Sequence, residues 1–206
     1  MKANVIAISR ALGANGEVVG RELATSMSFR YVDSEIIDLA AERVGATPDE
    51  VASAERRKGL LARIVEALAR ANLGVEAPLP PSTYADALGP DYPQVISAVI
   101  REIAAQGDCV LVAHGASHAL GATDGVARVL VTGSPERRAA RIRQDAYGPT
   151  RARQEIEESD RSRADFLKRF YGVDGESAEQ YDLVINTDRV SVADAVSAIR
   201  AIAGHS

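Results

Sequence analysis

The apolar residues of this chain gather in short continuous runs, a pattern typical of strands that are buried on both faces. The three clearest runs are Val5–Ile8, Cys109–Ala113 and Ala127–Val131. Helices cover both faces of a parallel sheet, so its strands lack the polar–apolar alternation of half-exposed strands. Two shorter runs, Phe29–Val32 and Tyr181–Asn186, are expected to be further strands. The pattern therefore favours a parallel sheet.

Between these runs the apolar positions return with the period of an amphipathic helix. Strands that alternate with helices indicate a doubly wound α/β fold. Gly74–Pro93 is rich in proline and has little periodicity, so we interpret it as a mobile loop or insertion. The expected helices are Glu17–Met27, Glu35–Val44, one that begins at Thr47, Leu60–Leu73, Tyr92–Ala105, Ser134–Asp145, Arg151–Tyr171 and Ser191–Ile202.

The stretch from Asn4 to Leu23 reads as a strand, a glycine-bearing loop and a helix. In nucleotide-binding α/β proteins such a loop places backbone N–H groups around phosphate at a helix N-terminus, where the helix dipole favours anions. The Walker A pattern continues with a Lys and a Ser or Thr after its last glycine. Here Gly13-Ala14-Asn15-Gly16 is followed by Glu17-Val18-Val19-Gly20, without a lysine. Such glycines also serve plain turns and close helix–sheet contacts, so the loop alone leaves both interpretations open.

Arginines are the second candidate feature. Arg10 and Arg21 flank the loop and could replace part of the missing lysine charge, although Arg21 fits a solvated surface position better. The segment Glu136–Arg169 is dense in arginine, and a phosphoryl-transfer enzyme needs cations that close over the moving group. Interleaved carboxylates make a salt-bridged exposed helix the better interpretation for most of them. The exceptions we select are Arg141, Arg161 and Arg163.

Two further segments lie where a ligand site is expected, because ligands of open α/β sheets bind beyond the carboxyl ends of the strands. His114-Gly115-Ala116-Ser117 is read as a loop directly after the run Cys109–Ala113, and His118 follows it. Two histidines at this spacing suggest a metal site only weakly, so no metal ligands are assigned. Asp33 follows the second apolar segment and could serve as a helix cap, a ligand contact or both.

Composition limits the class of protein. The 206 residues carry a formal net charge of −5 and are 46% hydrophobic but only 4% aromatic, which indicates a globular core of aliphatic side chains. The negative charge argues against nucleic-acid binding. The single cysteine, Cys109, excludes an internal disulfide and is expected to be buried and inert. The chain shows no membrane-spanning run or signal peptide, so a cytoplasmic location without membrane partners is expected.

Together these segments resemble the cytidylate kinase-like family of P-loop nucleoside monophosphate kinases. The resemblance is carried by Ile8-Ser9-Arg10 through Ala24, Tyr31–Ile37, Gly107–Ala116, Ser134–Ile142, Asp160–Arg163 and Tyr181–Thr187. It implies one P-loop kinase-like, three-layer domain with a five-stranded parallel sheet. The core would comprise residues 1–34, 94–146 and 180–206, with a helical acceptor-binding insertion over about 35–93 and an arginine-rich lid over about 147–175. A homodimer is left open.

The resemblance also implies roles for single residues. ATP with Mg²⁺ would be the donor, and a nucleoside monophosphate, first CMP or dCMP, the acceptor. Arg141, Arg161 and Arg163 would surround the transferring phosphate, and Asp33, His114, Gly115, Ala116 and Ser117 would face the acceptor. The donor would be bound by Arg10, Gly13, Ala14, Asn15, Gly16, Glu17, Val18, Val19, Gly20, Arg21, Asn186 and Thr187.

The chain departs from the family pattern at two places. In the comparison with cytidylate kinases, Val19 occupies the place of the P-loop lysine, and Gly20 and Arg21 that of the Mg²⁺-binding hydroxyl. The Asp-Gly-Arg-Asp run that reads cytosine is replaced by His114–Ser117. Two further hypotheses therefore stay open beside the kinase: a nucleotide- or phosphate-binding protein without turnover, and a scaffold that binds partners through Gly74–Pro93.

Overall fold

The computed structural model of the chain describes residues 2–36, 38–39, 92–112, 115–145 and 148–205. These fall into two compact units, Met1–Asp33 with Ile100–Ser206, and Ser34–Val99. The expected helix Leu60–Leu73, the helix beginning at Thr47, nearly all of the Gly74–Pro93 insertion and His114 lie outside the described residues. The division into core, insertion and lid stays a prediction.

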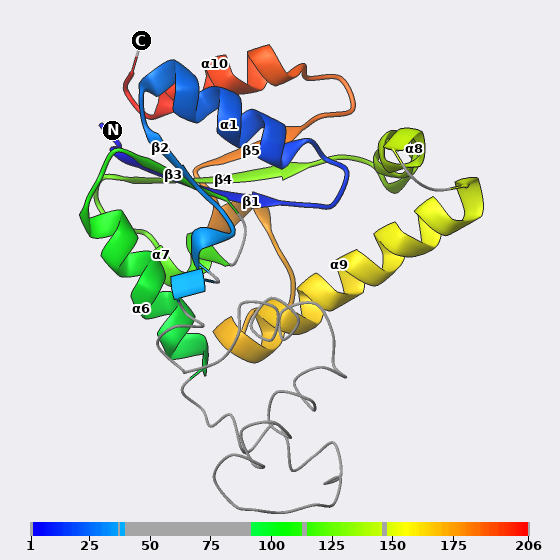
Figure 1. Cartoon of the computed structure of the whole chain (residues 1–206), viewed down its shortest axis with the longest axis horizontal. Coiled ribbons are helices and arrows are strands. Elements are labelled where there is room, and N and C mark those ends of the chain that lie inside the picture. The colour runs from blue at the N-terminus through cyan, green and yellow to red at the C-terminus, as the bar shows by residue number, and fades with distance from the viewer. Residues whose placement is uncertain (1, 37, 40–91, 113–114, 146–147, 206) are drawn as a thin grey trace, which may run out of the picture. The chain divides into compact units, whose positions relative to one another are not determined.

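The first unit is built on a five-stranded sheet that is parallel throughout (Figure 1). Its strands are β1 (Val5–Arg10), β2 (Arg30–Val32), β3 (Cys109–Val112), β4 (Val126–Thr132) and β5 (Leu183–Asn186), in the order β2-β3-β1-β4-β5. Each strand coincides with one of the apolar runs of the sequence, and the central strand β1 is buried from Val5 to Ser9. The predicted fold class is confirmed.

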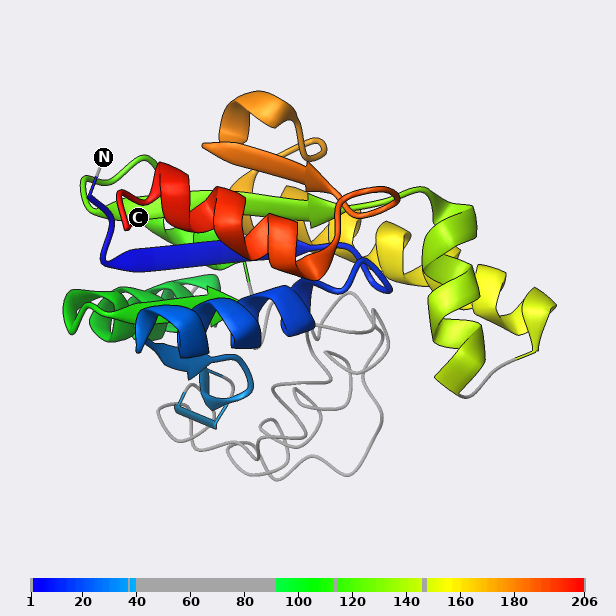
Figure 2. The same ribbon diagram turned by 90° about the horizontal axis from the view of Figure 1, so that it is seen from above.

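Helices cover both faces of the sheet (Figures 1 and 2). On one face α1 and α10 pack side by side, and their residues Val19, Leu23 and Ile199 join strand residues in a fully buried core. On the other face α7 packs against β1 and β4. The helices are α1 (Gly16–Met27), α6 (Tyr92–Ala105), α7 (Ala116–Leu120), α8 (Pro135–Asp145), α9 (Pro149–Tyr171) and α10 (Val192–Ile202), with a 3-10 turn η1 (Ala178–Gln180). No helix of the described residues is long and apolar enough to cross a membrane.

The structure corrects the interpretation of the segment after β3. The sequence predicts a loop through Ser117, but α7 begins at Ala116, directly after Gly115 in the left-handed conformation. Five residues that include Ser and His carry too little periodicity and helix propensity to be recognised as a helix. The other boundaries differ by few residues. One of these changes is in β1, which runs on to Arg10 because its polar end still pairs with Leu130 and Val131.

Because all five strands are parallel, their carboxyl ends lie at one edge of the sheet. The loop after β1, Asp33 after β2, the start of α8 after β4, and Thr187 after β5 all leave that edge. This is the edge at which open α/β sheets bind ligands. Segments distant in sequence therefore meet around the glycine loop, which positions the candidate site.

Candidate functional site

The loop between β1 and α1 has the backbone geometry of a phosphate cradle. Gly13 and Asn15 both adopt left-handed conformations, at φ 74° and 62°, and the Ala14 N–H donates to the Ala11 carbonyl at 3.1 Å. Asparagine tolerates this conformation better than most residues, so it can stand where other loops need glycine. The Asn15 side chain makes no capping bond, and α1 begins at Gly16. The helix N-terminus is therefore left open.

Three side chains hold the loop from behind by its carbonyl oxygens. The Arg138 guanidinium donates to the Leu12 carbonyl at 3.3 Å, and Arg141 donates to that of Gly13 at 3.0 Å. The Thr187 hydroxyl donates to the Ala14 carbonyl at 3.0 Å. The C=O and N–H of a trans peptide point in opposite directions, so the amides of Gly13 and Asn15 face away from these anchors.

The amide groups on the open side of the loop have no hydrogen-bond partner among the described residues. In the described part of the chain, Gly13, Asn15, Gly16, Glu17 and Val18 donate no backbone hydrogen bond. The last three are the first residues of α1, whose N–H groups have no acceptor within the helix. Five donors at the positive end of a helix dipole form an anion-binding surface.

The position of the missing lysine is different from the one that the sequence comparison assigned. Val19 is fully buried in the core between α1 and the sheet, so a side chain there cannot reach a ligand. At Gly20, an added Cβ would lie 2.6 Å from Val112 Cγ2, so this glycine serves close helix–sheet packing. In the Walker A pattern the lysine follows the last glycine, at the start of the helix. Since Asn15 takes that glycine's conformation, the lysine position is Gly16, and Glu17 occupies the place of the hydroxyl residue.

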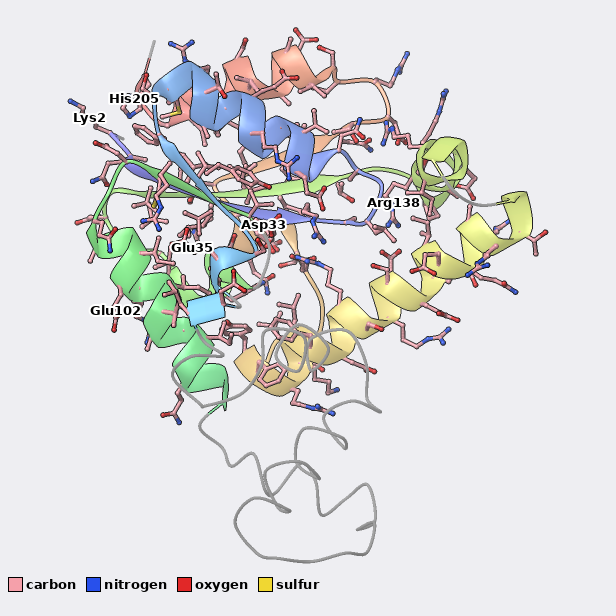
Figure 3. All side chains as sticks on the ribbon, in the orientation of Figure 1. Lys2, Asp33, Glu35, Glu102, Arg138 and His205 are labelled. Carbon is pink, nitrogen blue, oxygen red and sulfur yellow. The ribbon has the colours of Figure 1, made fainter. Side chains whose placement is uncertain are left out.

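Arg138 is the best-anchored arginine of the site, and the sequence did not single it out. Its side chain is 5% exposed and binds the Asp160 carboxylate with two hydrogen bonds of 2.8 and 2.6 Å. It also donates to the Gly133 carbonyl at 2.9 Å, so one side chain connects the loop, α8 and α9 (Figure 3). Its partner lies 22 residues further along the chain, so no local pattern separates Arg138 from its exposed neighbour Arg137.

The three arginines predicted to surround the phosphate do not converge. Arg141 binds the loop and Thr187, to whose carbonyl it donates at 2.5 Å. Arg163 binds Glu176 with two hydrogen bonds of 2.6 and 2.7 Å. Arg161 is exposed and has no hydrogen bond or ion pair with any described residue. In this structure Arg141 and Arg163 therefore have structural roles.

Arg163 belongs to a buried polar cluster that also includes Glu176, Tyr181 and His118. Tyr181 donates to Glu176, and its hydroxyl lies 3.3 Å from His118 Nε2. Burial alone would raise the pKa of Glu176, but hydrogen bonds from Arg163 and His118 lower it well below the usual range. Burial and the bond to Glu176 raise the pKa of Tyr181 far above its usual value. The cluster thus holds an ionised Glu176 carboxylate that is bound by an arginine and a tyrosine.

The predicted acceptor side is described in part. The Tyr31 hydroxyl donates to Asp33 at 3.2 Å, and the Arg21 guanidinium lies 5.1 Å from the centre of the Tyr31 ring. Burial and the nearby Asp33 carboxylate raise the pKa of Tyr31 to about 12. The Arg21 guanidinium therefore lies against the ring of a β2 residue. Asp33 lies at the end of β2, as Figure 3 shows.

The residues after His114 are packing residues rather than ligand contacts. Ala116 and Ser117 are 1% and 2% exposed, and the Ser117 hydroxyl donates to the Ala7 carbonyl of β1 at 3.1 Å. A Cβ at Gly115 would lie 2.6 Å from the Tyr171 ring, so this position allows α9 to approach.

The two residues predicted to lie near the adenine, Asn186 and Thr187, differ in burial. Thr187 is buried behind the loop, whereas the exposed Asn186 accepts a hydrogen bond from the Asp188 amide at 2.9 Å.

The site offers no preformed metal centre among the described residues, where no three His, Cys, Asp or Glu side chains gather. The Cys109 thiol is buried, and that burial raises its pKa to about 11, as expected for an inert cysteine. Among the described residues, the loop with its open amides is the feature suited to hold a charged ligand. Anionic ligands with several oxygens, such as phosphate groups, fit such a surface.

Comparison with known proteins agrees with this geometry. The model of the cytidylate kinase-like family matches residues 5–189. The chain belongs to this family. No curated protein matches it in sequence.

Solved structures share the fold at low sequence identity. An uncharacterized protein from Eubacterium ventriosum is 16% identical, with a TM-score of 0.65 over 98% of this chain and 99% of that one. TT1252 from Thermus thermophilus is 15% identical, with a TM-score of 0.52 over 99% and 98%. Shikimate kinase from Bacteroides thetaiotaomicron is 14% identical, with a TM-score of 0.50 over 96% of each chain. At such identities the likeness shows the fold alone.

Proposed function

We propose that this member of the cytidylate kinase-like family transfers the γ-phosphoryl group of ATP to a nucleoside monophosphate, with CMP or dCMP as the first candidates. Membership in the family supports a nucleotide-dependent kinase-type function. The observation that carries the proposal is the loop after β1, whose carbonyls are bound from behind while five amides stay open.

The described residues fit a triphosphate. The amides of Gly13 and Asn15–Val18 would hold its phosphates, and a cradle of this kind needs space at its glycine. A Cβ at Gly13 would lie 2.7 Å from the Arg138 carbonyl oxygen, so the loop can take this shape only with glycine there. ATP supplies the phosphoryl group when bound. Mg²⁺ usually binds through substrate phosphates and one or two carboxylates, and Glu17 is the carboxylate nearest to this cradle in sequence.

The acceptor is proposed from the family resemblance. Asp33 stands at the carboxyl end of β2, with its carboxylate bound by the Tyr31 hydroxyl at the edge of the sheet. A carboxylate here could accept hydrogen bonds from the sugar or base of a nucleotide. The choice of CMP over other nucleotides follows the family resemblance, and turnover measurements test it.

The test is a coupled assay of ADP release with Mg²⁺-ATP and a panel of CMP, dCMP, UMP, AMP and GMP. We expect turnover with at least one pyrimidine nucleotide and the highest kcat/KM with CMP or dCMP. Preference for a purine would contradict the proposed acceptor, and background rates with every nucleotide would contradict transfer to a nucleoside monophosphate.

A matched pair of glycine variants would show whether turnover uses the loop. Gly13 and Gly172 both have positive φ, at 74° and 66°, but only at Gly13 would a Cβ collide with another residue. Gly172→Ala should lose about 1 kcal/mol of stability from left-handed strain, and Gly13→Ala should lose more because its Cβ also collides with the Arg138 carbonyl. Only Gly13→Ala should lose ATP binding and turnover. Equal ATP binding and turnover in the two variants would mean that ATP binds at a site other than this loop.

A second candidate function, nucleotide binding without transfer, is favoured by the engagement of Arg141 and Arg163 in structural bonds. Catalysis of phosphoryl transfer consists largely of positioning and charge neutralisation, for which neither side chain is available in this structure. ATP binding in calorimetry, together with background turnover of the whole panel, would establish this candidate in place of the kinase.

A further inference from the structure

The arginines around the loop differ in how many of their hydrogen-bond donors are used. Arg138 donates to Leu12, Gly133 and Asp160, and Arg141 donates to Gly13 and Thr187. Arg10, the last residue of β1, forms an ion pair with only one side chain in the described part of the chain. Its Nε lies 2.5 Å from Glu17 Oε1, without the geometry of a hydrogen bond. A guanidinium has five N–H donors, and the four on the Nη atoms of Arg10 have no hydrogen-bond acceptor among the described residues.

Arg10 also occupies the space that a side chain at the lysine position would need. A Cβ built on Gly16 would lie 2.3 Å from Arg10 Cβ and 2.8 Å from its Cγ. These atoms are close to the backbone and cannot swing away as the end of a long side chain could. A lysine at position 16 and the arginine at position 10 therefore exclude each other in this conformation.

We propose that Arg10 binds the donor phosphates in place of the P-loop lysine, so that the cation comes from the end of β1 rather than from the start of α1. This inference rests on the proposed function. The Arg10 side chain is 26% exposed and stands beside the open amides of α1. Its planar fork suits two phosphate oxygens at once, which a lysine ammonium cannot bind in this way.

Glu17 has a defined part in this arrangement. It is in the first turn of α1, 34% exposed, and holds the Arg10 guanidinium at the mouth of the loop while no phosphate is bound. A phosphate carries more negative charge than a carboxylate and offers more acceptor oxygens. Nucleotide binding is therefore expected to draw the guanidinium from Glu17 to the phosphates.

The first experiment measures ATP affinity by calorimetry for wild type, Arg10→Ala, Arg10→Lys and Arg101→Ala. Arg101 is an exposed arginine of α6 and serves as the control for loss of one positive charge. Losing a charge-assisted contact should weaken ATP binding by about 10- to 100-fold in Arg10→Ala. Arg10→Lys should lose less, and Arg101→Ala should bind as wild type does. Equal affinity of wild type and Arg10→Ala would overturn the inference while leaving the proposed function intact.

The second experiment exchanges the two positions. Gly16→Lys alone should lower the melting temperature because of the collision with Arg10, and Arg10→Gly alone should weaken ATP binding. The double variant Arg10→Gly/Gly16→Lys moves the cation to the Walker position and should bind ATP more tightly than Arg10→Gly. A folded double variant that binds ATP no more tightly than Arg10→Gly would contradict the inference that the two positions can supply the same cation. If wild type itself fails to bind ATP, both the proposed function and the role of Arg10 are wrong.

Discussion

The glycine loop and the buried cluster around Glu176 are both built on arginines, but the arginines bind different partners. At the loop, Arg138 and Arg141 donate to neutral carbonyl oxygens, in addition to the ion pair of Arg138 with Asp160, and so fix the backbone that presents the open amides. In the cluster, Arg163 binds both oxygens of the Glu176 carboxylate, and Tyr181 also donates to one of them. The first arrangement prepares a surface for an external anion, whereas the second already contains its anion.

This difference predicts a separation of effects. Changes in the cluster should reduce stability and leave nucleotide binding unaltered, because its charge is neutralised within the protein. Changes behind the loop should alter nucleotide binding, because they release the backbone that presents the amides.

The largest loss of stability is expected for Glu176→Gln, which leaves Arg163 without its buried counter-charge. Breaking one side of a buried ion pair costs about 3 kcal/mol or more, and the two side chains here are only 15% and 20% exposed. Urea unfolding would measure this loss. The exposed Glu179→Gln, three residues away, should change stability by less than about 0.5 kcal/mol.

The same variant should change the acid limb of the stability curve. The lowered pKa of Glu176 means that its contribution is present above the pKa of an unfolded glutamate and is lost as pH falls through the folded value. The free energy of unfolding of Glu176→Gln should therefore fall less steeply than that of wild type as pH is lowered. An unchanged acid limb, or weakened ATP binding by this variant, would contradict the assignment of the cluster to stability.

The second largest effect is expected for Arg138→Met, which removes the connection between the loop, α8 and α9. Loss of hydrogen bonds from a buried charged group should cost about 2 kcal/mol, and ATP affinity should fall because the Leu12 carbonyl is released. Arg137→Met is the matched control on the same helix, with an exposed side chain. A loss of stability in Arg138→Met without a change in ATP affinity would show that the anchor does not shape the loop.

A smaller effect is expected for Thr187→Val, which keeps the shape of the side chain and removes its hydroxyl. That hydroxyl lies 3.0 Å from the carbonyl oxygens of both Ala14 and Thr132 and accepts from Arg141. The expected loss is about 1 kcal/mol of stability with a severalfold weaker affinity for ATP. Thr187→Ser retains the hydroxyl and should behave as wild type, and equal losses in the two variants would point to the methyl group instead.

The smallest effect is expected from Tyr31, on the decline of stability at alkaline pH. Because the folded pKa of Tyr31 is raised to about 12, its neutral form stabilises the fold below the ordinary tyrosine pKa. That contribution is lost as pH rises through the folded value. Tyr31→Phe should flatten the decline in stability over this range, as a series of unfolding curves would show. An identical decline in Tyr31→Phe would mean that other groups cause it.

The sequence is sufficient to predict the fold, because the runs of Val5–Ile8, Cys109–Ala113 and Ala127–Val131 are long, apolar and regularly separated by helices. It also locates the loop, since glycines follow directly after the first strand. What the sequence does not predict are the tertiary contacts of the arginines. The partners of Arg138 and Arg163 lie 22 and 13 residues away, and charge along the chain does not show which arginine reaches which acceptor.

The misplacement of the lysine has a similar cause. A sequence comparison can shift within the glycine loop by a few residues, because Asn15 takes a backbone conformation usually associated with glycine. Only the start of α1 at Gly16 and the burial of Val19 fix the register of the motif. The steric exclusion between Gly16 and Arg10 is likewise invisible in the sequence, since it depends on how close the end of β1 comes to the start of α1.

The central claim is that the open amides of the loop hold the phosphates of a nucleotide. Titration of ¹⁵N-labelled protein with Mg²⁺-ATP, followed by amide NMR, tests it most directly. The account predicts that the resonances of Gly13, Asn15, Gly16, Glu17 and Val18 move together, while those of the cluster around Glu176 stay in place. Unchanged loop resonances in the presence of saturating ATP would contradict it.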